Sequence, residues 1–159
     1  MSFTIRPFDA SRDRAAALTF IDGSQAYEHA FEPNRRLDGE VAAEWYGVLR
    51  ERVAAGRGRI FVAERDGRAI GWGIVIVELH PLYVVSDERE APFIIELFVE
   101  ESARGQGVGH ALIAACEAEA RRLGFRRIMI GVLVRNDRAA GIYASAGYEP
   151  YQIELTKRL

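Results

Sequence analysis

The spacing of hydrophobic residues in the first part of the chain predicts helices in some segments and strands in others. Apolar residues at intervals of three or four predict helices over residues 10–31 and 38–55. Runs rich in Ile, Val and Phe predict strands over residues 3–6, 59–64, 69–78 and 93–99. Asp66-Gly67 joins two of these strands and is typical of the tight turn in an antiparallel hairpin. Gly71 and Gly73 inside the third strand indicate a bulge or a close backbone approach.

The rest of the chain continues the alternation of helix and strand. One amphipathic helix is expected over residues 108–123, and a second begins at Asn136 and ends at Gly147. Strands are expected over residues 127–134 and 151–156. The element order is then β-α-α-β-β-β-α-β-α-β. It predicts an α/β (α+β) fold with a mixed, mostly antiparallel central sheet and helices on both faces.

Composition limits the class of protein. A chain of 159 residues, 49% hydrophobic and 28% charged, is expected to form one soluble domain over residues 1–159. One cysteine, Cys116, forms no internal disulfide, and three scattered histidines lack metal-ligand spacing, so no metal is expected. A net charge of −2 without a basic block disfavours nucleic acid. No apolar run has the length of a signal peptide or membrane span, so a cytoplasmic location without membrane partners is expected.

A glycine-rich segment lies between the strand at 93–99 and the helix at 108–123. It is Arg104-Gly105-Gln106-Gly107-Val108-Gly109, and its backbone N–H groups at a helix start are suited to an anion. The dinucleotide pattern G-x-G-x-x-G fails because its third glycine position is His110, and no lysine follows to make a phosphate loop of the Walker type. A structural loop that only needs left-handed backbone is the alternative.

Two motifs together narrow this choice. R-x-x-G-x-G at 104–109, after a strand and before an amphipathic helix, resembles the acetyl-CoA motif of the GNAT superfamily of N-acetyltransferases. Asn136, Ala139, Tyr143 and Gly147-Tyr148 resemble the second signature of that superfamily, N-x-x-A-x-x-x-Y-x-x-x-G-[FY]. The resemblance covers about a third of the chain, with Glu101 and Ala103 as departures from common family residues. It implies a GNAT-type sheet of 6–7 strands with a splayed centre.

The resemblance also implies acetyl-CoA as cosubstrate and a set of residues that hold it. The pyrophosphate would lie on the loop amides, beside Arg104, and the pantetheine arm would pair with the splayed strand. The implied cofactor-binding residues are Leu97, Phe98, Val99, Arg104, Gly105, Gln106, Gly107, Val108, Gly109, Asn136, Ala139 and Tyr143. For Asn136, a helix cap is an equally good explanation.

Transfer of an acetyl group to an amine needs a base and an acid. An alkyl amine with a pKa near ~10 is almost wholly protonated at neutral pH, so a group must accept its proton. Glu96 is the only carboxylate inside the central strand and is the candidate base, with a solvent-facing residue or an arginine partner as alternatives; Glu78 and Glu100 are weaker substitutes. Tyr143 is the candidate acid for the leaving thiolate, with a core aromatic as the alternative.

The resemblance leaves the acceptor open. The expected reaction is direct attack of a primary amine on acetyl-CoA through a tetrahedral intermediate. A small-molecule amine such as a polyamine or aminoglycoside would suit a closed acidic pocket, and a protein N-terminus or lysine would suit an open groove. A non-catalytic acyl-CoA-binding module is the alternative from another class. A homodimer is also conceivable, formed by pairing of residues 151–156 across two copies.

Overall fold

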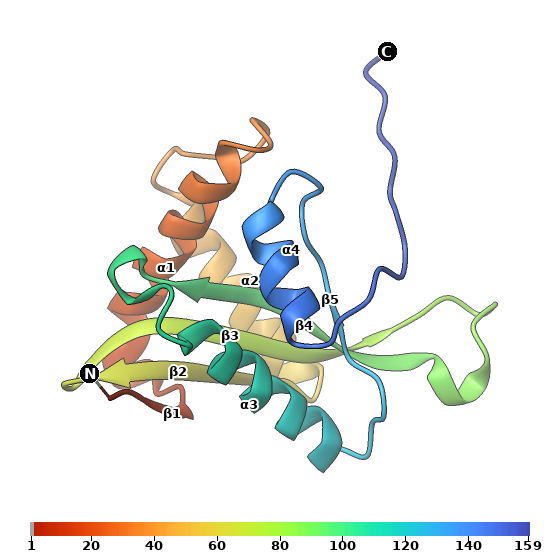
Figure 1. Ribbon diagram of the computed structural model, residues 1–159, viewed down its shortest axis with the longest axis horizontal. Coiled ribbons are helices and arrows are strands. Elements are labelled where there is room, and N and C mark those ends of the chain that lie inside the picture. Colours follow the sequence, from red (N-terminus) through yellow and green to blue (C-terminus); the bar gives the residue numbers. More distant parts are fainter. Residues whose placement is uncertain (1) are drawn as a thin grey trace.

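The computed structural model describes residues 2–159 and is built on one mixed, twisted sheet (Figure 1). Five strands follow each other in chain order across it: β1 (Thr4–Pro7), β2 (Arg59–Arg65), β3 (Arg68–Leu79), β4 (Glu90–Val99) and β5 (Met129–Ile130). The first four are antiparallel neighbours, and β5 runs parallel to β4. The hairpin expected around Asp66-Gly67 is confirmed, with Asp66 at φ 50° and Gly67 at φ 75° in the turn.

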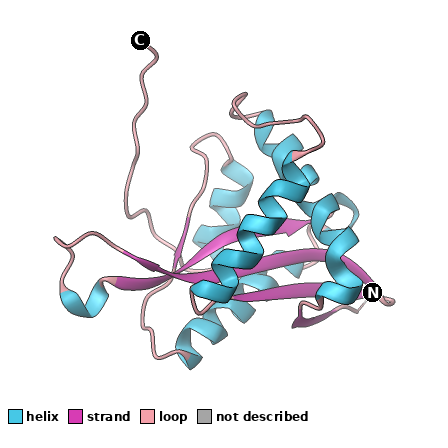
Figure 2. Cartoon of the chain, turned by 180° about the vertical axis from the view of Figure 1, so that it is seen from behind, coloured by secondary structure: helices cyan, strands magenta, loops and turns pink. Residues whose placement is uncertain are grey.

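Helices cover both faces of the sheet, as expected (Figures 1 and 2). On one face lie α1 (Ala10–His29) and α2 (Val41–Ala55), whose apolar side chains meet Trp72 and Ile74 of β3. On the other face lies α3 (Val108–Arg122), with Leu112 against Ile70. The short helix α4 (Asp137–Ser145) lies beside β5, and short 3₁₀ turns occupy Ser86–Glu88 and Glu101–Ala103.

The two central glycines of β3 allow close packing, and an irregularity in the pairing of β3 with β2 lies beside Gly71, where Ile70 is an extra residue. A Cβ at Gly71 would lie 2.6 Å from the carbonyl oxygen of Phe98, and one at Gly73 would lie 3.4 Å from Sγ of Cys116. Cys116 is fully buried, as expected of a small core residue. The glycines therefore bring β4 and α3 close to β3.

The parallel contact between β4 and β5 is short, and the two strands then separate. They pair only at Phe93 with Met129 and at Ile94 with Ile130. Beyond Ile94, β4 continues to Val99 beside β3 alone. The splayed centre that the resemblance implied is thus present, and it leaves one edge of β4 open.

A bulge interrupts β4 just where it leaves β5. Ile74 pairs with Glu96 and Val75 pairs with Ile94, so Ile95 is an extra residue in β4. Such a bulge reverses the alternation of side chains beyond it. Ile94 packs on the α3 side, whereas Ile95 packs on the α1–α2 side and Glu96 reaches Trp45 of α2. The bulge therefore turns Glu96 toward α1 and α2.

Two expected strands differ from the structure, which has five strands rather than six or seven. The strand expected over 127–134 is reduced to Met129–Ile130, and residues 151–156 form no strand. A strand needs a neighbour for its backbone groups, and within residues 2–159 neither segment has one beyond the contact of β5 with β4. None of the helices described by the structure has the length and apolar character to span a bilayer.

Candidate active site between β4 and β5

The glycine loop has the backbone conformation of an anion site. Gly105 and Gly107 have φ of 73° and 82°, a region that side-chain-bearing residues rarely adopt, and open space surrounds the position of a Cβ at each. Gly107 is the residue that begins α3, and no side chain of the described chain caps that helix. The glycines thus leave the start of α3 open to a ligand.

The amide groups of this loop are available. Within residues 2–159, no acceptor is recorded for the N–H groups of residues 105–110, and the first amide of α3 that is bonded is that of Ala111, to the carbonyl of Gly107. Together with the helix dipole, such a set of donors favours a phosphate group. The loop is thereby suited to the pyrophosphate of a coenzyme.

The side chain of Arg104 contacts the end of β4 and α1. Its Nε donates to the carbonyl oxygen of Val99 at 2.9 Å, and its guanidinium lies 5.0 Å from the ring centre of Tyr27 and 5.8 Å from that of Phe98. Within residues 2–159 only its Nε is engaged in a hydrogen bond, so the contact with a phosphate that the resemblance implied stays a prediction.

Asn136 acts as a helix cap. Its Oδ1 accepts from the backbone N–H of Ala139 at 3.1 Å, and the hydroxyl of Tyr27 lies 3.5 Å from the same oxygen. Both the cap and this contact fix the start of α4 next to α1. The conformation of α4, and so the direction of Tyr143, depends on this residue.

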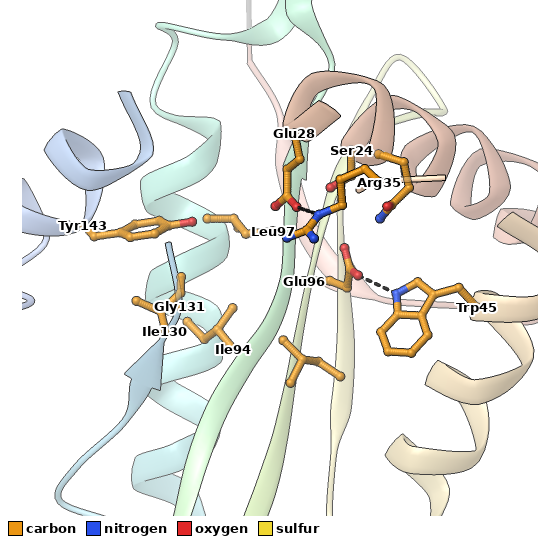
Figure 3. Close-up of a pocket in the computed structure, with 12 residues that line it drawn as sticks. Ser24, Glu28, Arg35, Trp45, Ile94, Glu96, Leu97, Ile130, Gly131 and Tyr143 are labelled. Carbon is orange, nitrogen blue, oxygen red and sulfur yellow. Dashed lines mark hydrogen bonds and ion pairs between the residues drawn. The ribbon is translucent and has the colours of Figure 1, made fainter. Parts of the chain in front are cut away.

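A cavity of about 380 Å³ opens where β4 and β5 separate (Figure 3). It is lined from α1, the loop after it, α2, both strands and α4, by Ser24, Gln25, Glu28, Arg35, Trp45, Ile94, Ile95, Glu96, Leu97, Ile130, Gly131 and Tyr143. Of the expected site residues, Glu96, Leu97 and Tyr143 lie in this wall, whereas the glycine loop lies at the start of α3.

Glu96 is held in the cavity by a hydrogen bond from Trp45. The indole Nε1 donates to Oε1 of Glu96 at 2.6 Å (Figure 3). Burial raises the pKa of this carboxyl to about 7, the nearby charge of Glu28 also raises it, and the Trp45 bond lowers it. A carboxyl with that pKa accepts protons readily near neutral pH.

Tyr143 enters the cavity from the opposite side. Its hydroxyl points from α4 toward β4 (Figure 3), and burial raises its pKa to about 12, with Glu28 and Glu96 adding to the rise. The phenol therefore remains protonated near neutral pH and is a donor. Glu96 and Tyr143 thus place an acceptor and a donor of protons on two sides of one cavity.

The remaining carboxylates considered as bases are engaged elsewhere. Glu78 pairs with Arg52, and Glu100 accepts two hydrogen bonds from Arg68 at 2.8 and 2.7 Å. Neither lines the cavity. Of the candidate bases in β3 and β4, only Glu96 faces this space.

The sequence pattern did not single out Arg35 and Trp45. Nε of Arg35 donates to Glu28 at 2.7 Å, and Trp45 orients Glu96. Trp45 lies in a helix without a recognisable motif. Only the contact across more than fifty positions reveals the role of Trp45.

An open amide loop, a splayed strand pair and a cavity that contains a carboxyl and a phenol are the features of this region that bear on function. Residues 24–148 match the model of the Acetyltransferase (GNAT) family, and the chain belongs to this family.

Individual relatives agree with this assignment. A mycothiol acetyltransferase from Thermomonospora curvata is 29% identical over 158 residues, which are 96% of this chain and 46% of the relative. A GCN5-related N-acetyltransferase from Ralstonia eutropha JMP134 superposes with a TM-score of 0.76 at 20% identity, over 99% of both chains. A predicted acetyltransferase with acetyl-CoA from Clostridium acetobutylicum gives a TM-score of 0.76 at 16% identity, over 99% of this chain and 96% of that one. The chain spans about half the length of the curated relatives it matches.

Proposed function

We propose that the protein transfers an acetyl group from acetyl-CoA to the primary amine of a small molecule, by direct attack through a tetrahedral intermediate. The observation that carries this proposal is the pairing of Glu96 and Tyr143 across one cavity at the open edge of β4. A binding module without catalysis has no need of a carboxyl whose pKa is raised to about 7 opposite a protonated phenol.

The residues present fit acetyl-CoA. The free amides of residues 105–110 accommodate the pyrophosphate without a side chain in the way. The backbone carbonyl of Val99 accepts the hydrogen bond from Arg104 on the side of β4 that faces away from β3. Because backbone groups alternate in direction along a strand, the backbone N–H and C=O groups of Leu97 point to the same open side. We therefore assign the pantetheine arm to the edge of β4 from Leu97 to Val99, where an N–H group would also polarise the thioester carbonyl.

Glu96 removes the proton from the attacking ammonium, directly or through a water molecule. With a pKa of about 7 it is largely ionised at pH 8, and the neighbouring Glu28 adds negative charge that favours a cationic amine. The conformation of Glu96 is fixed by Trp45, so the carboxylate needs little reorganisation before the proton moves.

Tyr143 then donates its proton to the sulfur that leaves. Its raised pKa makes donation to a thiolate in water uphill, because an unperturbed thiol has a pKa of ~8.5. Loss of water also destabilises a thiolate, so burial of the leaving sulfur would raise its basicity and make the transfer from Tyr143 less uphill.

The cavity supports a small acceptor. A volume of about 380 Å³ lies in the range of small-molecule sites, and its mouth carries the ion pair of Glu28 and Arg35. Two carboxylates, Glu28 and Glu96, outnumber the one arginine, which favours a positively charged amine over an acid.

We expect calorimetry to detect acetyl-CoA binding, and a thiol-release assay with a panel of polyamines, aminoglycosides, amino sugars and lysine peptides to identify an acceptor.

Gly107→Ala is expected to weaken acetyl-CoA binding roughly tenfold, because alanine is strained at a φ of 82° at the start of α3. Gly141→Ala, in α4 with open space around its Cβ position, is the matched control. Absence of acetyl-CoA binding at millimolar concentration contradicts the proposal, and turnover of peptides alone contradicts the small acceptor.

Trp45→Phe tests how Glu96 is tuned. The indole hydrogen bond lowers the pKa of Glu96, so its loss raises that pKa, and the acid limb of the kcat/KM profile moves upward by about 1–2 pH units. The plateau at high pH is retained, which separates tuning from a general loss of structure. Tyr46→Phe, on the same helix but outside the cavity wall, leaves the profile unchanged. An unshifted profile in Trp45→Phe would refute this role.

A further inference from the structure

Two carboxylates face the cavity, and they differ in what they contact. Glu96, from β4, accepts a hydrogen bond from the neutral indole of Trp45 at 2.6 Å. Glu28, in the last turn of α1, pairs with the guanidinium of Arg35, whose Nε lies 2.7 Å from its Oε2 (Figure 3). Among residues 2–159, Arg35 is the one cation recorded against Glu28, and none is recorded against Glu96. One carboxylate of the cavity therefore already has a positive partner, and the other does not.

Several contacts fix Arg35 in the loop between α1 and α2. Its Nη1 donates to Oδ1 of Asn34 at 2.8 Å, and its backbone carbonyl accepts from Nδ1 of His29 at 2.9 Å. The side chains of Arg35 and Glu28 are 29% and 32% exposed, so water and salt screen this pair less than an ion pair on the open surface. The guanidinium is therefore a fixed part of the cavity wall rather than a freely moving surface group.

The charges of the cavity leave room for one ammonium group. Of the residues that line it, Glu28 and Glu96 supply two negative charges and Arg35 one positive charge, which leaves a single negative charge when Glu96 is ionised. An alkyl amine with a pKa near ~10 is an ammonium at neutral pH, so one such group beside Glu96 makes the cavity neutral. The charge of Glu28 also raises the pKa values of Glu96 and Tyr143, which indicates that Glu28 and its partner lie close to the reacting groups. A second ammonium in this space meets the guanidinium of Arg35 at short range.

We propose that Arg35 restricts the acceptor to amines with a single ammonium group, because its guanidinium occupies a second cation site whose carboxylate is Glu28. The inference rests on the proposed function, since it concerns the amines that reach Glu96. A diamine with one nitrogen at Glu96 has to hold its other nitrogen against the guanidinium or displace the guanidinium from Glu28, and both arrangements cost electrostatic energy. A monoamine bears neither cost. The acceptor class thus narrows to small monoamines, and short diamines and polyamines are poor substrates.

Kinetics with matched pairs of acceptors test the role of Arg35. Each alkyl monoamine of three to six carbons is compared with the α,ω-diamine of the same length, and thiol release gives kcat/KM at pH 8. In the native protein, we expect each monoamine to be used roughly tenfold better than its diamine. In Arg35→Gln, the uncharged side chain leaves Glu28 free to hold an ammonium group, so the preference is expected to reverse for at least one chain length. A native protein without a preference for monoamines overturns the inference.

Three further variants separate the charge of Arg35 from its place in the loop. Arg35→Lys retains the positive charge and is expected to retain the preference for monoamines. Arg36→Gln is the matched control, because Arg36 is the next residue of the same loop, pairs with Asp38 and Glu44, and does not line the cavity. It should keep the native preference. In the double variant Arg35→Gln, Glu28→Gln, the reversal seen in Arg35→Gln should be lost. An equal change of kcat/KM for both members of each pair in Arg35→Gln would mean that Arg35 only anchors the loop, and overturns the inference.

Calorimetry with CoA in place of acetyl-CoA measures the same selectivity without the reaction. The ratio of diamine affinity to monoamine affinity is expected to be roughly tenfold higher in Arg35→Gln than in the native protein, and an unchanged ratio overturns the inference. The two proposals can then fail separately. If no amine causes thiol release, the proposed acetyl transfer is contradicted, and the binding ratio still decides the role of Arg35. If thiol is released but neither ratio depends on Arg35, only the present inference is contradicted.

Discussion

Glu96→Gln is expected to lower kcat roughly 100- to 1000-fold at pH 7.5, the largest effect of any single change in the cavity except that at Tyr143. Glutamine keeps the shape of the side chain and can still accept the hydrogen bond from Trp45, but it cannot take a proton from the attacking amine. Binding of acetyl-CoA, which we assign to the glycine loop and the edge of β4, should change little. Steady-state kinetics with the acceptor identified in the amine panel, together with calorimetry, measures both quantities.

The pH dependence of kcat/KM is a second test of Glu96 as the base. In the native protein, kcat/KM is expected to fall below an apparent pKa of about 7 as Glu96 becomes protonated, and this limb should disappear in Glu96→Gln.

The thermal stability of Glu96→Gln shows whether a loss of activity comes from misfolding. Because burial raises the pKa of Glu96 in the folded state, the folded protein binds the proton more tightly than the unfolded chain, and stability falls as pH rises from the unfolded pKa of about 4.5 through 7. Glutamine removes that cost, so Glu96→Gln should unfold at pH 8 at a temperature no lower than the native protein. A variant that keeps both native kcat and the acid limb would assign the base to another group.

Tyr143→Phe is expected to lower kcat 100-fold or more while the dissociation constant of acetyl-CoA stays within about threefold of the native value. Phenylalanine keeps the ring in the cavity wall and removes only the hydroxyl to which we assign protonation of the leaving sulfur. The defect should shrink with an acetyl thioester of a more acidic thiol, because such a thiolate leaves without a proton.

Tyr148→Phe is the matched control for this change. Its ring centre lies 6.3 Å from that of Tyr143, it belongs to the same motif, and it does not line the cavity. It should retain kcat within about twofold. If Tyr143→Phe lost as little as Tyr148→Phe, or if its defect did not depend on the leaving thiol, Tyr143 would be a packing residue rather than the acid.

Local features of the sequence predicted much of the fold. The hairpin at Asp66-Gly67, the left-handed Gly147 after α4 and the cap at Asn136 all depend on residues within a few positions of one another. The same holds for the glycine loop, whose amides are exposed because of its own backbone conformation. Such features can be predicted without knowledge of the rest of the chain, because the residues that cause them are close together in sequence.

Long-range contacts decided the rest of the candidate site. The direction of Glu96 follows from a bulge in the pairing of β3 with β4, and its hydrogen bond comes from a helix 51 positions earlier. Arg104 donates to the carbonyl of Val99 and lies beside two aromatic rings, contacts that its motif did not predict. Neither arrangement has a signature in the local pattern, because each depends on which surfaces the folded chain brings together.

The sequence by itself therefore determined the family motifs, the helices and the order of the strands, since turn residues, caps and periodicity act over short distances. The tertiary structure decided which of the candidate carboxylates faces the cavity, how Tyr143 lies relative to it, and that residues 151–156 lack a strand neighbour among residues 2–159. Strand chemistry is local, but a strand forms only where another backbone edge is within reach. That is why a segment with the pattern of a strand is left unpaired here.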